Sequence, residues 1–558
     1  MTEPVPPTAS SAAPGDPRAD GVRPDRALPA GVTPSVLVDG LEVRTESLGG
    51  SPLARAALAG RVPAHWYAPV PAGPDAWRAH ADALLHQFSA GAWLELLAPA
   101  LDAHGAAAAR LAEVAGGAGV VVTTGQQPGL FGGPLYTLSK ALGARALADA
   151  VQAATGVPVA PVFWAATDDT DFAEASRTYI AGRDGLTELA IHTDADDGMP
   201  MSAVPLGREV GQLGVRLAGT VGALTYEPAL RAALATFREG ETVGGAYVAL
   251  LRRLLEPLGI AVLDASHAAV REGGFQLLRR ALLVSATVEE AVRARGSEIE
   301  AAGFAPQVPE VPGRSLVFRY DATGRKARVP TTDARALVPR VARGALGPNV
   351  LLRPVVERFL LPTLAYVAGP GEYAYFAQVS AVAAALHVPH PVAVPRWSGT
   401  VVEPHVRRAL TRLGAELDDV VDADALAARL ARARLPDEAT AAVARLRAAV
   451  DEQMGALGDV PNVIEPPVIA GARAQIAHRI DRLERRLVAA EKRRAADVAR
   501  DLVTVTAALR PRGARQERVL NAVPLLARHG PALTDAMLTA ARAHADAVVA
   551  HGAGAFGL

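Results

Sequence analysis

Short apolar runs alternate with segments of helical periodicity over the first 400 residues of the chain. Five of these runs are short and rich in β-branched residues, which is typical of strands buried on both faces. Apolar positions three and four residues apart recur between them and predict amphipathic helices. Strands that alternate with helices favour an α/β fold with a doubly wound parallel sheet. The five predicted strands are Val120 to Thr124, Val157 to Ala166, Gly259 to Asp264, the run that begins at Leu364, and Pro391 to Val394.

A glycine-rich turn follows the first predicted strand. Gly125, Gly129, Gly132 and Gly133 precede Pro134, and an apolar-periodic helix is predicted to follow. Proline fits the first turn of a helix, where its missing N–H group is no loss. Free backbone N–H groups and a helix N-terminus beyond a strand predict an anion site. The turn holds neither GxxxxGK[ST] nor GxGxxG, so it is neither a Walker loop nor a dinucleotide fingerprint.

Two stretches of short segments, at 175–225 and 304–345, interrupt the α/β pattern and predict small strand-rich insertions. After about residue 401 the composition shifts to helix formers. Further helices are predicted at 52–115, 228–237, 243–255 and 268–299. The predicted domains are a disordered tail at 1–40, a core at 41–400, a helical coiled-coil domain at 401–545 and a C-terminal tail at 546–558.

Within the helical domain, one set of apolar residues recurs at alternating spacings of four and three. Arg and Glu crowd the positions between them, which is typical of a short coiled coil with charged flanks. We therefore predict a long antiparallel helical arm and expect it to form a homodimer. A helical hairpin that packs on its own domain is the alternative interpretation. The recurring residues are Ile476, Ile480, Leu483, Leu487 and Ala490.

Composition narrows the class of protein. A length of 558 residues predicts two or three domains, and a formal net charge of −1 gives no basic excess for nucleic-acid binding. The chain has no cysteine, which excludes disulfides, thiolate nucleophiles and Cys-ligated zinc. No run of about 18 apolar residues predicts a membrane span. The first residues lack the apolar region of a signal peptide, so we expect a cytoplasmic protein.

The glycine-rich turn and several later blocks together resemble a known family. The chain is similar to the bacillithiol-biosynthesis cysteine-adding enzymes of the BshC family, in the family's order and from about residue 45 to beyond 530. The matching blocks are Thr124 to Thr137 with Lys140, Pro161 to Trp164 with its acidic continuation, Asn349 to Pro354, Leu361-Pro362, Ala365 to Val367, Gly369 to Glu372, Tyr375-Phe376 and Gln516 to Arg518.

The resemblance implies a Rossmann-like core with two connecting insertions and a coiled-coil domain used for dimerisation. It implies the last step of bacillithiol synthesis, in which L-cysteine is joined to the amine of glucosaminyl malate. The core also resembles class I aminoacyl-tRNA synthetases and nucleotidyltransferases, which activate a carboxylate with ATP. ATP or ADP is therefore the cofactor to test. No metal is predicted, because no histidine or second acidic cluster lies near the acidic block in the sequence.

One block departs from the family pattern. The family usually reads Glu-Asp-His-Asp after the tryptophan strand, whereas this chain reads Asp168-Asp169-Thr170-Asp171. The change removes the group best suited to proton transfer near neutral pH. It leaves room for a rival, an ATP-dependent ligase of the same core that acts on another amino acid. A second rival is a catalytically degenerate relative that works as a coiled-coil interaction protein.

The acidic block supplies the candidate catalytic residues. Three acids as close as Asp168, Asp169 and Asp171 cannot all be buried and ionised cheaply, so we expect them to face a cationic ligand, a metal or solvent. We assign catalysis to Asp169 and Asp171, which hold the amino sugar and ease proton removal from its amine. The alternative is an exposed acidic turn that caps the next helix.

Further candidates are expected to bind the substrates. The amides of Gln126 and Gln127 can bind hydroxyls or a carboxylate. Arg353 can bind an anionic group such as malate, and Glu372 can bind a cationic amine. The alternatives are a tight turn for the glycines, a solvated surface position for Lys140, core positions for Trp164 and Tyr136, and a helix N-terminal acid for Glu372. The substrate-binding candidates are Gly125, Gln126, Gln127, Gly133, Tyr136, Lys140, Trp164, Asp168, Thr170, Arg353 and Glu372.

Overall fold

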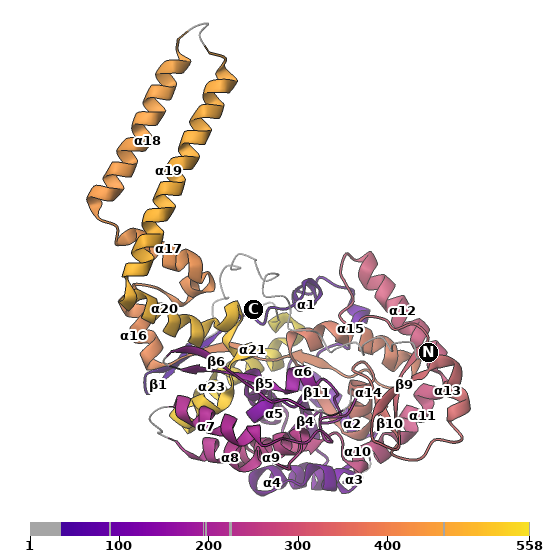
Figure 1. The fold of residues 1–558 in the computed structure, drawn as a ribbon. Helices are drawn as coiled ribbons and strands as arrows, with labels where there is room; N and C mark the ends of the chain where they lie inside the picture. The colour runs from indigo at the N-terminus through magenta and orange to yellow at the C-terminus, as the bar shows by residue number, and fades with distance from the viewer. Residues whose placement is uncertain are drawn as a thin grey trace. The chain divides into compact units, whose positions relative to one another are not determined.

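A five-stranded parallel sheet forms the centre of the larger of two compact units (Figure 1). The computed structural model describes residues 35–88, 91–182, 184–193, 195, 198–221, 226–460 and 464–556. Numbered by their succession along the chain, the five strands lie in the order 3-2-1-4-5, which is that of a Rossmann-like sheet. All five predicted strands and the doubly wound class are confirmed. The strands are β3 (Val120–Gln126), β4 (Val159–Ala165), β7 (Ala261–Asp264), β11 (Thr363–Ala368) and β12 (Ala393–Pro395).

Helices bury the sheet. The valines at 120, 121 and 122 of β3 are all 0% exposed, as expected for a strand covered on both faces. Helix α5 (Tyr136–Thr155) packs on β3 and β4, and α23 (Pro531–His551) packs on α5. The middle of α5 is therefore buried nearly all round. Other helices around the sheet are α2 (Pro74–Leu85), α4 (Gly105–Gly116), α9 (Val243–Leu255) and α15 (Pro370–Ala385).

The two insertions are partly as predicted. In the first, β5 (Arg177–Gly182) and β6 (Gly185–Ala190) pair, but residues 201–206 form a turn and an irregular segment instead of a strand. Helix α7 (Glu209–Val221) then follows, and its buried residues, Val210, Leu213, Leu217 and Val221 among them, have the helical spacing that the prediction overlooked. The second insertion holds the predicted strands, β8 (Arg314–Tyr320) and β9 (Lys326–Pro330), with β10 (Leu346–Pro348).

The predicted long helix at 268–299 is not one continuous helix. It divides into α10 (Ala268–Gly273), α11 (Phe275–Leu283) and α12 (Ser285–Ala301). The first break falls at the pair Gly273-Gly274. A Cβ at Gly273 would lie 2.7 Å from a methyl carbon of Leu360, so a residue without a side chain lets the helix approach its neighbour closely.

Both predicted tails are shorter than expected where the structure describes them. Strand β1 (Ser35–Val38) pairs with β2 (Leu41–Thr45), which pairs with β13 (Gly399–Val402). Residues 1–34 of the predicted tail lie outside the described residues. At the other end α23 continues through residue 551, so the predicted tail at 546–558 is wrong there. Residues from 516 onwards belong to the core unit and not to the helical domain, because α23 packs on α5 beside the sheet.

The second compact unit comprises residues 181–186 and 403–515 and is mostly helical. Helices α18 (Asp437–Gly458) and α19 (Pro466–Arg494) lie side by side as a hairpin (Figure 1). Arg447 of α18 pairs with Asp481 of α19 at 2.8 Å, which links the two helices. The helical nature of the predicted domain is confirmed. Its other helices are α16 (Pro404–Leu413), α17 (Ala423–Ala433) and α20 (Ala496–Leu509).

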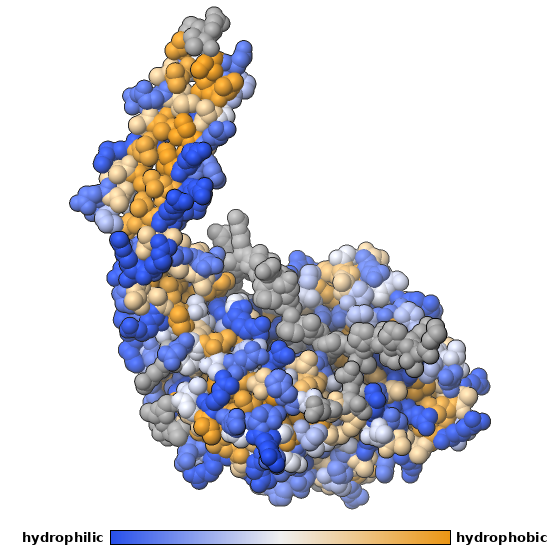
Figure 2. Space-filling view, viewed as in Figure 1, coloured by the Kyte–Doolittle hydropathy of each residue, from blue (hydrophilic) through white to orange (hydrophobic). Residues whose placement is uncertain are grey.

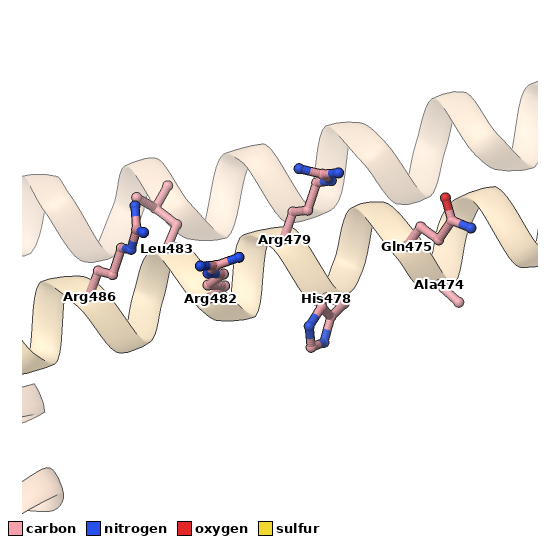
Figure 3. A pocket seen from close by; sticks show the side chains of 7 residues that line it. All are labelled: Ala474, Gln475, His478, Arg479, Arg482, Leu483 and Arg486. Atoms are coloured by element: carbon pink, nitrogen blue, oxygen red, sulfur yellow. The ribbon is translucent and has the colours of Figure 1, made fainter.

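Some residues of the predicted coiled-coil stripe are buried inside the hairpin, and others are exposed. Ile480 is 4% exposed within the hairpin, whereas Ile476 and Leu483 are 36% and 45% exposed. Apolar side chains follow the length of the hairpin, with charged ones beside them (Figure 2). Close by, Leu483 lines a shallow surface hollow on α19 together with Arg479, Arg482 and others (Figure 3). The pairing of α18 with α19 therefore accounts for one side of the stripe and leaves the other side exposed. None of the helices in the described ranges is both long enough and apolar enough to cross a membrane.

Candidate active site

The predicted site residues meet at the carboxyl edge of the sheet, where the strand order reverses between β3 and β11. Ligands of open α/β sheets bind in the crevice at such a point. Gln126 ends β3, and Glu372 lies in the first turn of the helix that follows β11. The acidic block follows β4 at the same edge, since Gln126 is in register with Ala165 of β4.

Lys140 is an internal residue of this edge. Its side chain is 2% exposed, and its ammonium forms a 2.5 Å ion pair with Glu372. It also donates to the backbone carbonyl of Gly125 and, at 3.1 Å, to Oε1 of Gln126. Three acceptors match the three protons of an ammonium group. Lys140 is therefore neither a solvated surface lysine nor free to bind a phosphate. It fixes the end of β3 and the orientation of Gln126.

Glu372 connects Lys140 to a second buried charge pair. Tyr366 donates its hydroxyl to Glu372 at 2.5 Å, and the guanidinium of Arg353 lies over the Tyr366 ring, 4.9 Å from its centre. Arg353 in turn pairs with buried Glu357 at 2.6 Å. Burial acts to raise the pKa of Glu372, but Lys140, the Tyr366 hydroxyl and Arg353 together outweigh it and hold that pKa below its usual value. Glu372 thus stays ionised.

Arg353 and Glu372 keep limited access to solvent, at 13% and 19% of their side chains. Glu372 also accepts a hydrogen bond from the backbone of Gly369 at 2.7 Å, so the alternative interpretation as a helix N-terminal acid holds as well. Arg353 begins α14 (Arg353–Leu360) and also donates to Tyr375 at 3.4 Å. Both residues can reach a ligand only through the faces that these contacts leave open.

A second polar cluster contains a carboxylate that the sequence analysis missed. Glu174 accepts from the Gln127 amide at 2.6 Å and from the Tyr136 hydroxyl at 3.3 Å. Tyr136 itself accepts from the Gln126 amide at 3.1 Å. Gln126 thus joins the two clusters, because its other amide atom accepts from Lys140. Hydrogen bonds and ion pairs run without a break from Glu174 to Glu372.

Glu174 has a pKa suited to proton transfer. Burial, and then the nearby carboxylates of Asp171 and Asp169, raise the pKa of Glu174 to about 7. The sequence signal was present, since Glu174 continues the acidic block three residues after Asp171. That spacing is also typical of a helix cap, so the sequence alone did not single out Glu174 as a site residue.

The acidic block itself is largely occupied by structural contacts. Asp168 pairs with Lys326 of β9 at 2.8 Å, a partner from the second insertion that the sequence did not indicate. Asp169 accepts from the backbone of Asp171 at 2.8 Å, and Asp171 accepts from the backbone of Glu174 at 3.0 Å. Asp171 is the N-cap of α6 (Phe172–Ala175), so the alternative is confirmed in the capping role, whereas the turn is half-buried and not exposed as that alternative had it. The catalytic assignment of Asp169 and Asp171 stays a prediction.

The glycine-rich turn is a scaffold more than an anion cradle. The backbone N–H groups of Gly132 and Gly133 donate to carbonyls within the turn, and that of Thr137 donates to Pro134. Gly132 and Gly133 have φ angles of +90° and +73°, which favour glycine. Two carbonyls of the turn, at 130 and 131, accept from the side chain of Asn521. The expected free donors are therefore wrong at these positions.

Trp164 and Gly125 have packing roles. Trp164 is 2% exposed, in agreement with the core alternative. A Cβ at Gly125 would lie 2.8 Å from the carbonyl oxygen of Trp164, so a side chain there would force β3 and β4 apart. Thr170 lies in the half-buried turn between Asp169 and Asp171.

The matching block at 516–518 also supports this edge. Arg396, directly after β12, forms a bidentate pair with Glu517 of α21 (Gln516–Val519), at 2.7 and 2.6 Å. Both side chains are 3% exposed. Gln516 exchanges two 2.8 Å hydrogen bonds with the backbone of Val401. These contacts hold α21 against the sheet and bring Arg518 close enough to Glu174 and Tyr136 to act on their charges.

Comparison with known proteins gives one consistent result. Residues 88–338 and 339–397 match the N-terminal Rossmann-like domain of bacillithiol biosynthesis BshC, and residues 399–547 match its C-terminal coiled-coil domain. A relative from Koribacter versatilis is 32% identical over 465 residues, which cover 80% of this chain and 86% of the relative. One from Geobacillus thermodenitrificans is 30% identical over 435 residues, covering 74% and 80%. Both are named "Putative cysteine ligase BshC".

Proposed function

Because the chain belongs to the BshC family of bacillithiol biosynthesis, a family of carbon–nitrogen bond-forming ligases, we propose that it joins L-cysteine to the amine of glucosaminyl malate. This amide-forming reaction is the last step of bacillithiol synthesis. The observation that carries the proposal is the continuous polar network at the sheet's switch point. It presents partly exposed carboxylates and one partly exposed guanidinium to the same edge.

The chemistry of the network suits these substrates. Glucosaminyl malate carries an amine on the sugar and carboxylates on the malate. Glu174 and the carboxylates of the acidic turn offer negative charge to the amine, and Arg353 offers a planar donor set to a malate carboxylate. Gln126 and Gln127 offer amides to sugar hydroxyls. Because their partners fix most of these groups before a ligand arrives, little reorganisation is needed on binding.

The assay with and without ATP tests how the cysteine carboxylate is activated. The resemblance to class I synthetases suggests ATP, but the N–H groups of Gly132 and Gly133 are engaged within the turn, which does not fit a phosphate cradle at those positions. The predictions for Asp169 and Asp171 are retained as proposals in their first part, that the two carboxylates hold the amino sugar, and Asp169→Asn should abolish product if Asp169 does so.

The proposal extends to a cytoplasmic homodimer, and the open side of the hairpin stripe supports dimer formation through the helical unit. Leu446 of α18 and Ile476 and Leu483 of α19 are 44%, 36% and 45% exposed. Apolar residues in a row along exposed helices are typical of an interface between helices.

The test of the reaction uses purified full-length protein with glucosaminyl malate and L-cysteine, with and without ATP. Mass spectrometry should find a product equal to the two substrates less one water. L-serine in place of L-cysteine is the matched control, and its product should be at least tenfold less abundant, because a site that recognises one side-chain group discriminates against its replacement. Folded protein that forms no product in either condition would overturn the proposal.

A further inference from the structure

Glu174 is positioned to exchange a proton with a ligand at the sheet edge. It lies on α6, directly after the acidic turn, and its side chain is half-buried, so it keeps contact with solvent. The Gln127 amide holds Oε2 at 2.6 Å and the Tyr136 hydroxyl holds Oε1 at 3.3 Å. Each carboxylate oxygen has more than one acceptor site, so these two contacts leave room for a further donor.

The reaction needs a group that removes a proton from the substrate nitrogen. An amine in neutral water is largely an ammonium ion, which has no lone pair with which to attack a carbonyl carbon. Thr170 stands where the resemblance places a histidine, and threonine does not titrate in this range. Another side chain must take that role if the reaction proceeds.

The other carboxylates at this edge are poorer acceptors. Asp168 is paired with Lys326 at 2.8 Å, and Glu372 is paired with Lys140 at 2.5 Å. Asp169 and Asp171 accept from backbone N–H groups of their own turn, so the turn fixes their orientation and its geometry depends on their charge. Glu174 has no cationic partner within ion-pair distance in the described part of the chain, and neutral donors alone hold it in place.

We propose that Glu174 accepts the proton that the substrate ammonium loses before its nitrogen attacks the activated carboxyl carbon. The assignment rests on the proposed function. In this step one proton moves from the ammonium nitrogen to a Glu174 oxygen. The products are a neutral amine, which keeps the electron pair of the broken N–H bond, and a neutral carboxyl. No bond to carbon forms or breaks in the step.

The surroundings of Glu174 match this use. Asp169 and Asp171 face it from the acidic turn, Tyr136 from α5, Tyr247 from α9 and Arg518 from α21. Burial and the two aspartates raise the pKa of Glu174 to about 7. Burial also raises the pKa of Tyr136 well above its ordinary value, so its phenol stays protonated and donates to the carboxylate.

The experiment compares Glu174→Gln, Glu174→Ala and the control Glu188→Gln in the cysteine-addition assay between pH 5.5 and 9. Glu188 is an exposed carboxylate of β6, outside the network. In Glu174→Gln, kcat should fall at least about 100-fold with KM within about threefold, the usual scale for loss of an acid–base group. The acidic limb of kcat near pH 7 should disappear, while Glu188→Gln keeps it. Formate should restore turnover to Glu174→Ala in a saturable manner.

The outcomes separate the two proposals. Wild-type protein that forms no product overturns the proposed function, and the assignment of Glu174 with it. Active wild type with unchanged kcat and pH profile in Glu174→Gln overturns the assignment of Glu174 alone. A folded Glu174→Ala variant with reduced activity that formate does not restore also overturns it, because it points to a structural role. Circular dichroism of each variant identifies those that fail to fold, and Glu174→Gln, which keeps the shape of the side chain, then decides.

Discussion

The sheet edge and the helical hairpin both depend on charged residues, but they use them in opposite ways. At the edge, Arg396 and Glu517 are each 3% exposed and bond through both oxygens of the carboxylate. On the hairpin, Arg447 and Asp481 are 41% and 43% exposed and make one contact at 2.8 Å. The same kind of ion pair therefore works in a dry environment in one region and in water in the other.

This difference has energetic consequences. A buried charge that loses its partner cannot be hydrated, so removal of the partner costs much stability. An exposed charge that loses its partner regains its hydration. Buried pairs hold their groups in one geometry, which a site needs before its ligand binds. Exposed pairs on a hairpin favour solubility and leave the apolar positions to decide which helices meet.

The largest effect is expected at the buried Arg396–Glu517 pair. Glu517→Gln should lower the free energy of unfolding by about 3–5 kcal/mol, because it leaves the Arg396 guanidinium buried without a counter-charge. Urea unfolding followed by circular dichroism measures it. The double variant Arg396→Met, Glu517→Leu should recover much of the loss. A single variant as stable as the wild type would contradict the buried pair.

A pH-dependent effect is expected at Glu174. Its folded pKa of about 7 lies above the ordinary 4.5, so the folded protein binds more protons than the unfolded chain between these values and wild-type stability falls as pH rises through them. Glu174→Gln removes this cost. The variant should match the wild type near pH 4 and exceed it by up to about 3 kcal/mol at pH 8. Thermal unfolding at several pH values measures the difference. A constant difference at all pH values would contradict the raised pKa.

Leu483 tests the open side of the hairpin. If two copies meet there, Leu483→Glu should weaken the dimer by about 1.5–3 kcal/mol per buried leucine, which is at least tenfold in the dissociation constant. Light scattering after size exclusion measures the mass at several concentrations. The wild type should be a dimer. Gln276→Glu, at an exposed position of α11 in the core unit, controls for the added negative charge. A wild type that remains a monomer at every concentration would contradict the proposed interface.

The smallest effect is expected at the exposed hairpin pair. Arg447→Gln should leave the unfolding midpoint within experimental error at 0.15 M salt, because Asp481 and Glu484, which Arg447 contacts on α19, remain hydrated when these contacts are lost. The matched comparison is Glu517→Gln in the same buffer. A loss at Arg447 as large as that at Glu517 would remove the contrast between the two regions.

Hydrophobic periodicity predicted the sheet well, because a buried strand leaves a local signature that does not depend on distant residues. Val120 to Thr124 and the strands beside it are in this class. The same reasoning located the edge where Gln126 and Glu372 meet. It failed where a pattern was read too simply, as at α7 and at the break in the predicted long helix.

The partners of the site residues were beyond local reasoning. Lys140 looked like a surface lysine or a ligand-binding one, and only the packing of α5 buries it beside Glu372. Lys326 and Asn521 come from distant segments, and nothing near them in sequence links them to Asp168 or to the glycine-rich turn. Glu174 stands in the sequence next to the acidic block, but a capping role for Asp171 explains its spacing, so the sequence did not identify Glu174 as a site residue.

A crystal structure of the full chain with glucosaminyl malate, without cysteine so that no turnover occurs, tests the location of the reaction most directly. We expect the sugar amine at about 3 Å from a Glu174 oxygen and the malate beside Arg353 at the carboxyl edge of β3 and β11. Glucosaminyl malate bound elsewhere, for example in the hollow on α19, with the network at the sheet edge untouched, would contradict it.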